Sequence, residues 1–82
     1  MSQIFARRAS TTKIMMSSAF KQGFDDARNG VQFDWRNDSW DYERGRHFAH
    51  IAPVDMSLRN GSKLNPKALA LCQAAVVRKL II

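Results

Sequence analysis

The feature that most constrains the fold is a pair of apolar stripes at helical spacing, each of which contains a glycine. The first stripe includes Phe20, Gly23 and Phe24, and the second includes Tyr42 and Gly45. Residues three or four apart share one face of a helix, so each stripe predicts an amphipathic helix. A glycine inside a helix costs about 1 kcal/mol relative to alanine. Two glycines at matching places therefore predict close contact between the two helices.

The first helix is expected to run from about Lys13 to Asn29. Thr11 or Thr12 is a suitable N-cap, and Gly30 is suited to a left-handed conformation at the end. The predicted buried stripe consists of Met16, Phe20, Gly23, Phe24 and Ala27. Off this stripe, Lys21 and Asp25 are four residues apart and predict a surface ion pair.

The second helix is expected to begin after Asp38 or Ser39 and to end near Ile51, because Pro53 stops it. Residues 53–64 predict a loop. The Asn60-Gly61 pair indicates a turn, but its flanks alternate too weakly to establish a hairpin. Phe33 and Trp35, in the connector before this helix, are expected to cover the helix pair.

The third helix is expected over about Lys67 to Leu80, with Asn65 as the cap and Pro66 in the first turn. Its predicted apolar face consists of Leu69, Cys72, Ala75, Val76 and Leu80, widened by Ala68, Leu71 and Ile81. This face either completes the core against the glycine-bearing pair or forms part of a homodimer seam.

A chain of 82 residues with 45% hydrophobic residues is typical of one small folded domain. We expect an all-α, three-helix domain over residues 13–82, preceded by a basic arm over residues 1–12 that lacks any acid. A mitochondrial targeting segment is the less favoured interpretation of that arm, since no cleavable spacer follows it. No apolar run approaches the roughly 20 residues of a membrane span, and the lone Cys72 fits a reducing cytoplasm.

The net charge of +6 is the main clue to a partner. Residues 1–30 contain five basic and two acidic side chains, residues 31–50 three and four, and residues 51–82 five and one. A polyanion is therefore expected to contact the two ends of the chain. The alternative is that the basic balance only keeps a small protein soluble.

Patterns typical of catalysis, metal binding or cofactor binding are missing from the sequence. His47 and His50 lack a companion thiol or carboxylate motif, and the glycines do not form a phosphate-binding loop. Cys72 lies on an apolar helix face, which favours a core residue over a nucleophile. We therefore expect no enzyme activity, no metal and no cofactor.

The segment from Ala19 to Ala49 resembles the ribosome modulation factor family of small bacterial proteins. The matching residues are Ala19, Gly23, Phe24, Ala27, Gly30, Tyr42, Gly45 and Ala49, with Trp40 just ahead of Tyr42. This resemblance implies two helices joined by a loop, and binding to ribosomal RNA that holds ribosomes inactive. The chain departs from the family in the acids of this segment and in the residues that follow it.

The resemblance and the charge together predict a small non-enzymatic regulator that binds a ribosome through ribosomal RNA or another nucleic acid. The residues expected to contact phosphates are Arg7, Arg8, Lys13, Arg44 and Arg46, and those expected to stack on a base are Trp35 and Trp40. The alternative is a bacterial or phage inhibitor or adaptor that blocks a host nucleic-acid enzyme complex. Its acidic contact face would consist of Asp25, Asp26, Asp34, Asp38, Asp41 and Glu43.

Overall fold

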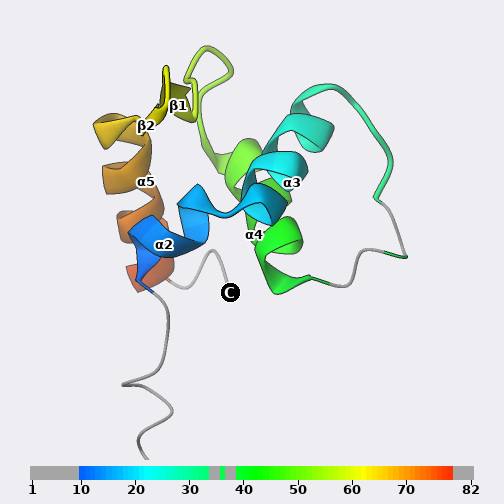
Figure 1. Ribbon diagram of the computed structural model, residues 1–82, viewed down its shortest axis with the longest axis horizontal. Helices are drawn as coiled ribbons and strands as arrows, with labels where there is room; N and C mark the ends of the chain where they lie inside the picture. The colour runs from blue at the N-terminus through cyan, green and yellow to red at the C-terminus, as the bar shows by residue number, and fades with distance from the viewer. Residues whose placement is uncertain (1–9, 34–35, 37–38, 79–82) are drawn as a thin grey trace, which may run out of the picture.

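The computed structural model describes residues 10–33, 36 and 39–78 of the chain, and this part is mostly helical (Figure 1). Its elements are helices α2 (Thr11–Met16), α3 (Ser18–Arg28) and α4 (Trp40–Ile51), strands β1 (Arg59–Asn60) and β2 (Lys63–Leu64), and helix α5 (Pro66–Val77). The prediction of an all-α domain is confirmed. The described residues contain four helices and not three, because the first predicted helix is divided into α2 and α3.

Ser17 divides the first predicted helix. Its backbone is extended, with φ −68° and ψ 149°. The Ser17 hydroxyl donates to the Ile14 carbonyl at 2.7 Å and accepts from the Phe20 backbone N–H at 3.1 Å. It therefore closes α2 and caps α3. The break also changes the buried residue: Met15 is fully buried, whereas Met16, which we predicted in the buried stripe, is 40% exposed.

Apart from Ser17, the residues that cap α2, α3 and α4 agree with the prediction except at the start of α2. The N-cap of α2 is Ser10, whose hydroxyl accepts a first-turn backbone N–H at 3.1 Å. The prediction of Thr11 or Thr12 as the cap was wrong, because the helix already begins at Thr11. Gly30 follows α3 with φ +72°, as predicted, and Ser39 caps α4.

The close contact between α3 and α4 is confirmed, and it passes through the two predicted glycines. A Cβ added at Gly23 would overlap the backbone carbonyl oxygen of Tyr42, and one added at Gly45 would overlap that of Phe20. Each glycine thus faces the backbone of the opposite helix. Any larger residue at either place would push the helices apart.

One hydrophobic core joins all four helices. The rings of Phe20 and Phe24 lie 5.9 Å and 5.8 Å from the Phe48 ring, centroid to centroid. Helix α5 adds to this core the buried residues Ala68, Cys72 and Ala75. It therefore completes the core, which is one of the two roles we predicted for it. Val76, which we placed on the buried face, is exposed, so that part of the prediction was wrong.

A short hairpin lies where we predicted a loop. β1 and β2 pair antiparallel, with Arg59 opposite Leu64 and Asn60 opposite Lys63, and Gly61 in the turn has φ +66°. Strands of two residues are too short to show an alternating pattern, which is why the sequence did not predict them.

Helix α5 begins as predicted. The Asn65 side-chain oxygen accepts from the Lys67 backbone N–H at 3.0 Å, and Pro66 occupies the first helical position. The helix ends at Val77, whereas we predicted an end near Leu80, which lies outside the described residues.

Candidate nucleic-acid interface

The predicted nucleic-acid-binding residues within the described part of the chain come from two helices. Arg7, Arg8 and Trp35 lie outside that part, whereas Lys13 lies on α2 and Trp40, Arg44 and Arg46 lie on α4. Lys13 is exposed, and Trp40 is 58% exposed. Trp40 is therefore the described aromatic residue of this set that is accessible to a base.

The two predicted arginines of α4 have partners within the chain. Arg44 Nη1 lies 3.0 Å from Asp41 Oδ1, and both side chains are partly exposed. Arg46 Nη1 donates to the Tyr42 hydroxyl at 3.2 Å, and its guanidinium carbon lies 5.8 Å from the Tyr42 ring and 5.7 Å from the Phe33 ring. Phe33 also contacts Tyr42 edge to face, so the predicted cover over the helix pair is confirmed for Phe33. Arg46 is thus held by aromatic packing.

Three acids of the helix pair, Asp25, Asp26 and Asp41, interact with neighbouring side chains. Lys21 Nζ donates to Asp25 Oδ2 at 2.6 Å, which confirms the predicted surface pair. Asp26 accepts from the Gln22 amide at 2.7 Å and from the Tyr42 hydroxyl at 2.8 Å. With Asp41 paired to an arginine as well, three members of the predicted acidic face have partners. Asp34 and Asp38 lie outside the described residues.

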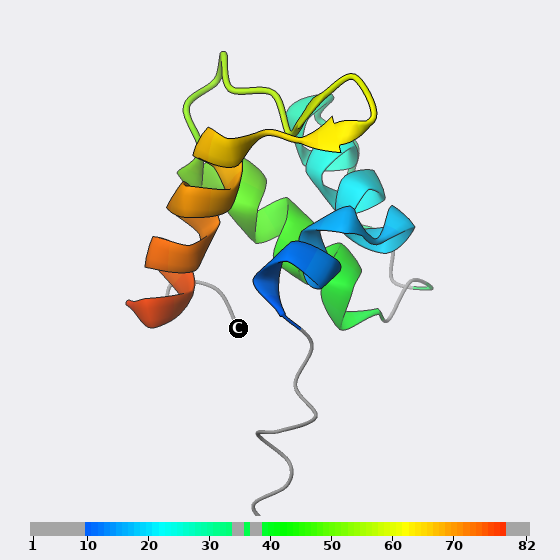
Figure 2. The same cartoon turned by 60° about the vertical axis from the view of Figure 1, so that its left-hand side comes forward.

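The fold brings together the two basic thirds of the chain. Helix α2, from the N-terminal third, contacts both β2 and α5 from the C-terminal third (Figures 1 and 2). Arg59 Nη2 donates to the Met16 carbonyl at 3.0 Å and so joins the hairpin to the end of α2. Cations that are far apart in the sequence, such as Lys13 and Lys63, therefore lie on elements in direct contact.

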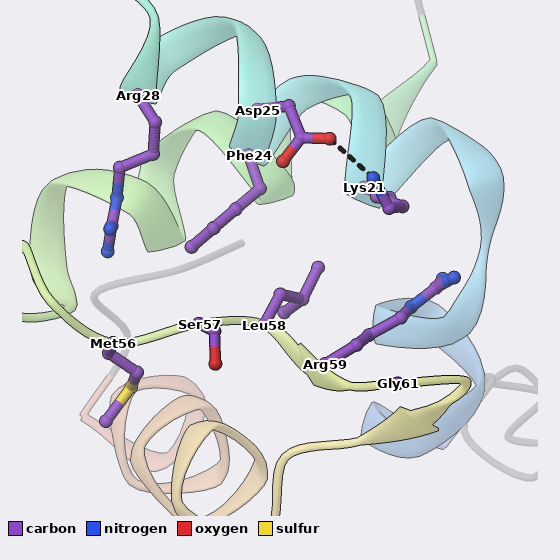
Figure 3. A pocket seen from close by; sticks show the side chains of 9 residues that line it. All are labelled: Lys21, Phe24, Asp25, Arg28, Met56, Ser57, Leu58, Arg59 and Gly61. Carbon is purple, nitrogen blue, oxygen red and sulfur yellow. Dashed lines mark hydrogen bonds and ion pairs between the residues drawn. The ribbon is translucent and has the colours of Figure 1, made fainter.

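A groove of about 460 Å³ lies between α3 and residues 56–61 (Figure 3). Phe24 extends from α3 and Leu58 from the opposite segment into the space between them. The charged side chains that line the groove are Lys21, Asp25, Arg28 and Arg59. The lining thus contains three cations and one acid, and its cations come from both basic thirds.

Two arginines span the groove near its ends. Arg28 extends from α3 and donates to the Val54 carbonyl at 2.7 Å and the Pro53 carbonyl at 2.8 Å, with its guanidinium carbon 4.5 Å from the Phe24 ring centroid. Arg59 extends in the opposite direction toward α2 (Figure 3). The Nε atoms of both arginines are buried and make no hydrogen bond. Such an unsatisfied donor costs about 1–3 kcal/mol.

The three groove cations Lys21, Arg28 and Arg59 were not among the predicted nucleic-acid-binding residues. Lys21 and Arg28 are seven apart in one helix and so share a face, which is a signal that sequence inspection alone can detect. Arg59 has no such signal, because its position depends on how the hairpin packs against α2.

The described residues include neither a metal-binding group of side chains nor an activated thiol. No group of three His, Cys, Asp or Glu side chains there is arranged to hold a metal ion, and His47 and His50 are exposed. Burial raises the pKa of the Cys72 thiol to about 11, which disfavours the reactive thiolate. Among the described helices, none has both the length and the apolar character needed to cross a membrane.

Comparison with known proteins gave no match to a family model, to a curated protein or to a solved structure. The resemblance to the ribosome modulation factor family is therefore a prediction that rests on residue spacing in α3 and α4.

Proposed function

We propose that this protein is a small non-enzymatic regulator that binds a ribosome through ribosomal RNA. The observation that supports this most is the packing of α2 against β2 and α5, because it joins the two basic thirds of the chain in one region. Phosphate contacts supply most of the affinity of a protein for nucleic acid, and they need several cations within one region.

The balance of internal pairing also favours a polyanionic partner. The carboxylates of Asp25, Asp26 and Asp41 form ion pairs or hydrogen bonds with side chains of their own chain. In contrast, Lys63 and Lys67 are exposed and form no ion pair with any described residue. These two lysines are therefore available to a polyanion, whereas Asp25, Asp26 and Asp41 already have partners within the chain.

The helix pair supplies a rigid support for this surface. The glycine crossing holds α3 and α4 in one arrangement, and the same spacing carries the resemblance to the ribosome modulation factor family. On α4, exposed Trp40 lies one turn before Arg44, so a stacking ring and a cation share one helix face. Single-stranded RNA is bound by this combination of ring stacking and cationic contacts.

The test is co-sedimentation of the full chain with purified bacterial ribosomes at about 50 mM and about 200 mM salt, with and without nuclease. With about five phosphate contacts, affinity for single-stranded RNA is expected to fall by about a hundredfold over this range. A parallel tagged pull-down from bacterial lysate identifies what else is retained.

Loss of binding with both salt and nuclease is the expected result. Affinity that does not change with salt would contradict the proposal. Recovery of one protein complex that survives both treatments would replace it with the inhibitor or adaptor function.

A further inference from the structure

The groove between α3 and residues 56–61 concentrates positive charge that the sequence distributes widely. Lys21 and Arg28 come from α3, and Arg59 comes from a strand about thirty residues further along (Figure 3). Asp25 is already bound to Lys21 at 2.6 Å, so it offsets one of the three cations. The groove therefore has a net positive charge that comes from its two arginines.

The arginines also have hydrogen-bond donors that the chain does not use. A guanidinium has five N–H donors in a planar fork. Arg28 uses its Nη atoms for two carbonyls, and Arg59 uses one Nη for the Met16 carbonyl. These bonds lie at exposed positions, whereas each Nε is buried without a partner. An anion at the exposed Nη edges would find donors already oriented by the carbonyl bonds.

The groove has the size of a small-ligand site. Its volume of about 460 Å³ falls within the ~300–1,000 Å³ typical of such sites, which suits one nucleotide unit and not a double helix. Apolar Leu58 and Met56 border the space between the cations. A positively charged groove that tracks the backbone is one component of the sites that bind single-stranded nucleic acid without sequence preference.

We infer that this groove binds the phosphate backbone of a single-stranded RNA segment, with Arg59 and Arg28 as its main phosphate contacts. The inference rests on the proposed function and deepens it, because it places the phosphate contact between α3 and the hairpin instead of at Arg44 and Arg46. Guanidinium groups bind phosphate oxygens through parallel N–H bonds, which a lysine cannot reproduce.

The first experiment maps the site directly. The full chain, labelled with ¹⁵N, is titrated with a single-stranded RNA hexamer, and in a separate arm with inorganic phosphate at the same phosphate concentration. We expect the hexamer to shift the amide signals of residues 21–28 and 56–61 and the side-chain Nε–H signals of Arg28 and Arg59. The phosphate arm should shift them far less.

The second experiment compares two variants that each lose one positive charge. Arg59→Gln is expected to weaken hexamer binding about tenfold and to reduce the salt slope by about 0.7. Arg78→Gln, at the exposed end of α5, is the matched control and should weaken it by no more than about twofold. Arg59→Lys keeps the charge but loses the fork, so its affinity should lie between those of the wild type and Arg59→Gln.

The outcomes separate this inference from the proposed function. RNA binding whose shifts map to Trp40 and Arg44, or equal losses in Arg59→Gln and Arg78→Gln, would overturn the groove and leave the RNA-binding function in place. Equal shifts from inorganic phosphate would identify a small-anion site and likewise overturn it. Absence of any RNA binding by the wild type would refute both, and the titration decides this even if Arg59→Gln unfolds.

Discussion

Replacing Gly45 with alanine is expected to destabilise the protein, although the same change in an ordinary helix would stabilise it. The added Cβ would overlap the carbonyl oxygen of Phe20 and would stand 2.9 Å from the Phe20 carbonyl carbon and 3.0 Å from the Phe24 nitrogen. All of these are backbone atoms of α3. A backbone cannot yield by changing rotamer, so the substitution must displace one helix relative to the other.

The expected magnitude follows from two opposing effects. Alanine has a higher helix propensity than glycine by about 1 kcal/mol, which favours the variant. Overpacking costs about 1–3 kcal/mol and sometimes more. The upper end applies here, because moving α3 from α4 also disturbs the packing of Phe20 and Phe24 against Phe48. The net loss is therefore about 2 kcal/mol, which lowers the Tm of a domain of this size by about 8–16 °C.

The assay is thermal and urea unfolding followed by circular dichroism for Gly45→Ala, Gly23→Ala and the double variant. Both glycines face the same crossing, so once one alanine has separated the helices the second should cost less, and the two losses should not add. Gly30→Ala is the control. Among the described residues, no atom beyond its chain neighbours lies within 4 Å of its Cβ position, but φ of +72° costs an alanine about 1–2 kcal/mol. That loss should add to the loss at Gly45.

An unchanged or raised Tm for Gly45→Ala would refute the close crossing, because it is the result expected of a glycine at an exposed helix position. Additive losses for the two crossing glycines would refute the claim that they report one contact.

Three further predictions concern individual side chains. Ser17→Ala should reduce the free energy of unfolding by about 1 kcal/mol in urea unfolding, because it removes the hydroxyl that closes α2 and caps α3. Ser17→Asp should restore part of this loss. Equal stability of all three proteins would contradict the division of the helix at this residue. Tyr42→Phe should lower the free energy of unfolding by about 1–2 kcal/mol in the same assay, because it leaves Asp26 with one donor fewer in a partly buried site. Stability equal to that of the wild type would show that the bond from the Tyr42 hydroxyl contributes nothing. The Cys72 thiol, whose pKa burial raises from 9.0 to about 11, should react about a hundredfold more slowly with a thiol reagent in the folded than in the unfolded chain near neutral pH. The folded state binds the thiol proton of Cys72 more tightly than the unfolded state. The stabilisation from this proton is therefore complete below pH 9.0 and declines as the pH rises toward about 11. Unfolding curves at several pH values would detect this decline.

The candidate site was predictable only in part, for reasons that differ between residues. The composition of the two chain ends shows their excess of basic residues. The spacing of Lys21 and Arg28 shows that they share one helix face. Their meeting with Arg59 was not predictable, since it depends on the turn at Gly61 and on a hydrogen bond to the end of α2. Arg44 and Arg46 were selected because they are cationic, yet sequence spacing does not reveal that Arg46 packs over aromatic rings.

Local chemistry determined most of the helical architecture. Helical periodicity and capping residues predicted the end of α3 and both ends of α4 and α5 to within a few residues, and matched glycines predicted the crossing at Gly23 and Gly45. These features depend on neighbours in the chain, which the sequence contains. The break at Ser17, the burial of Met15 in place of Met16, the hairpin and the groove were decided by the tertiary structure. A serine or a two-residue strand allows more than one local conformation, and only contacts between distant segments select one of them.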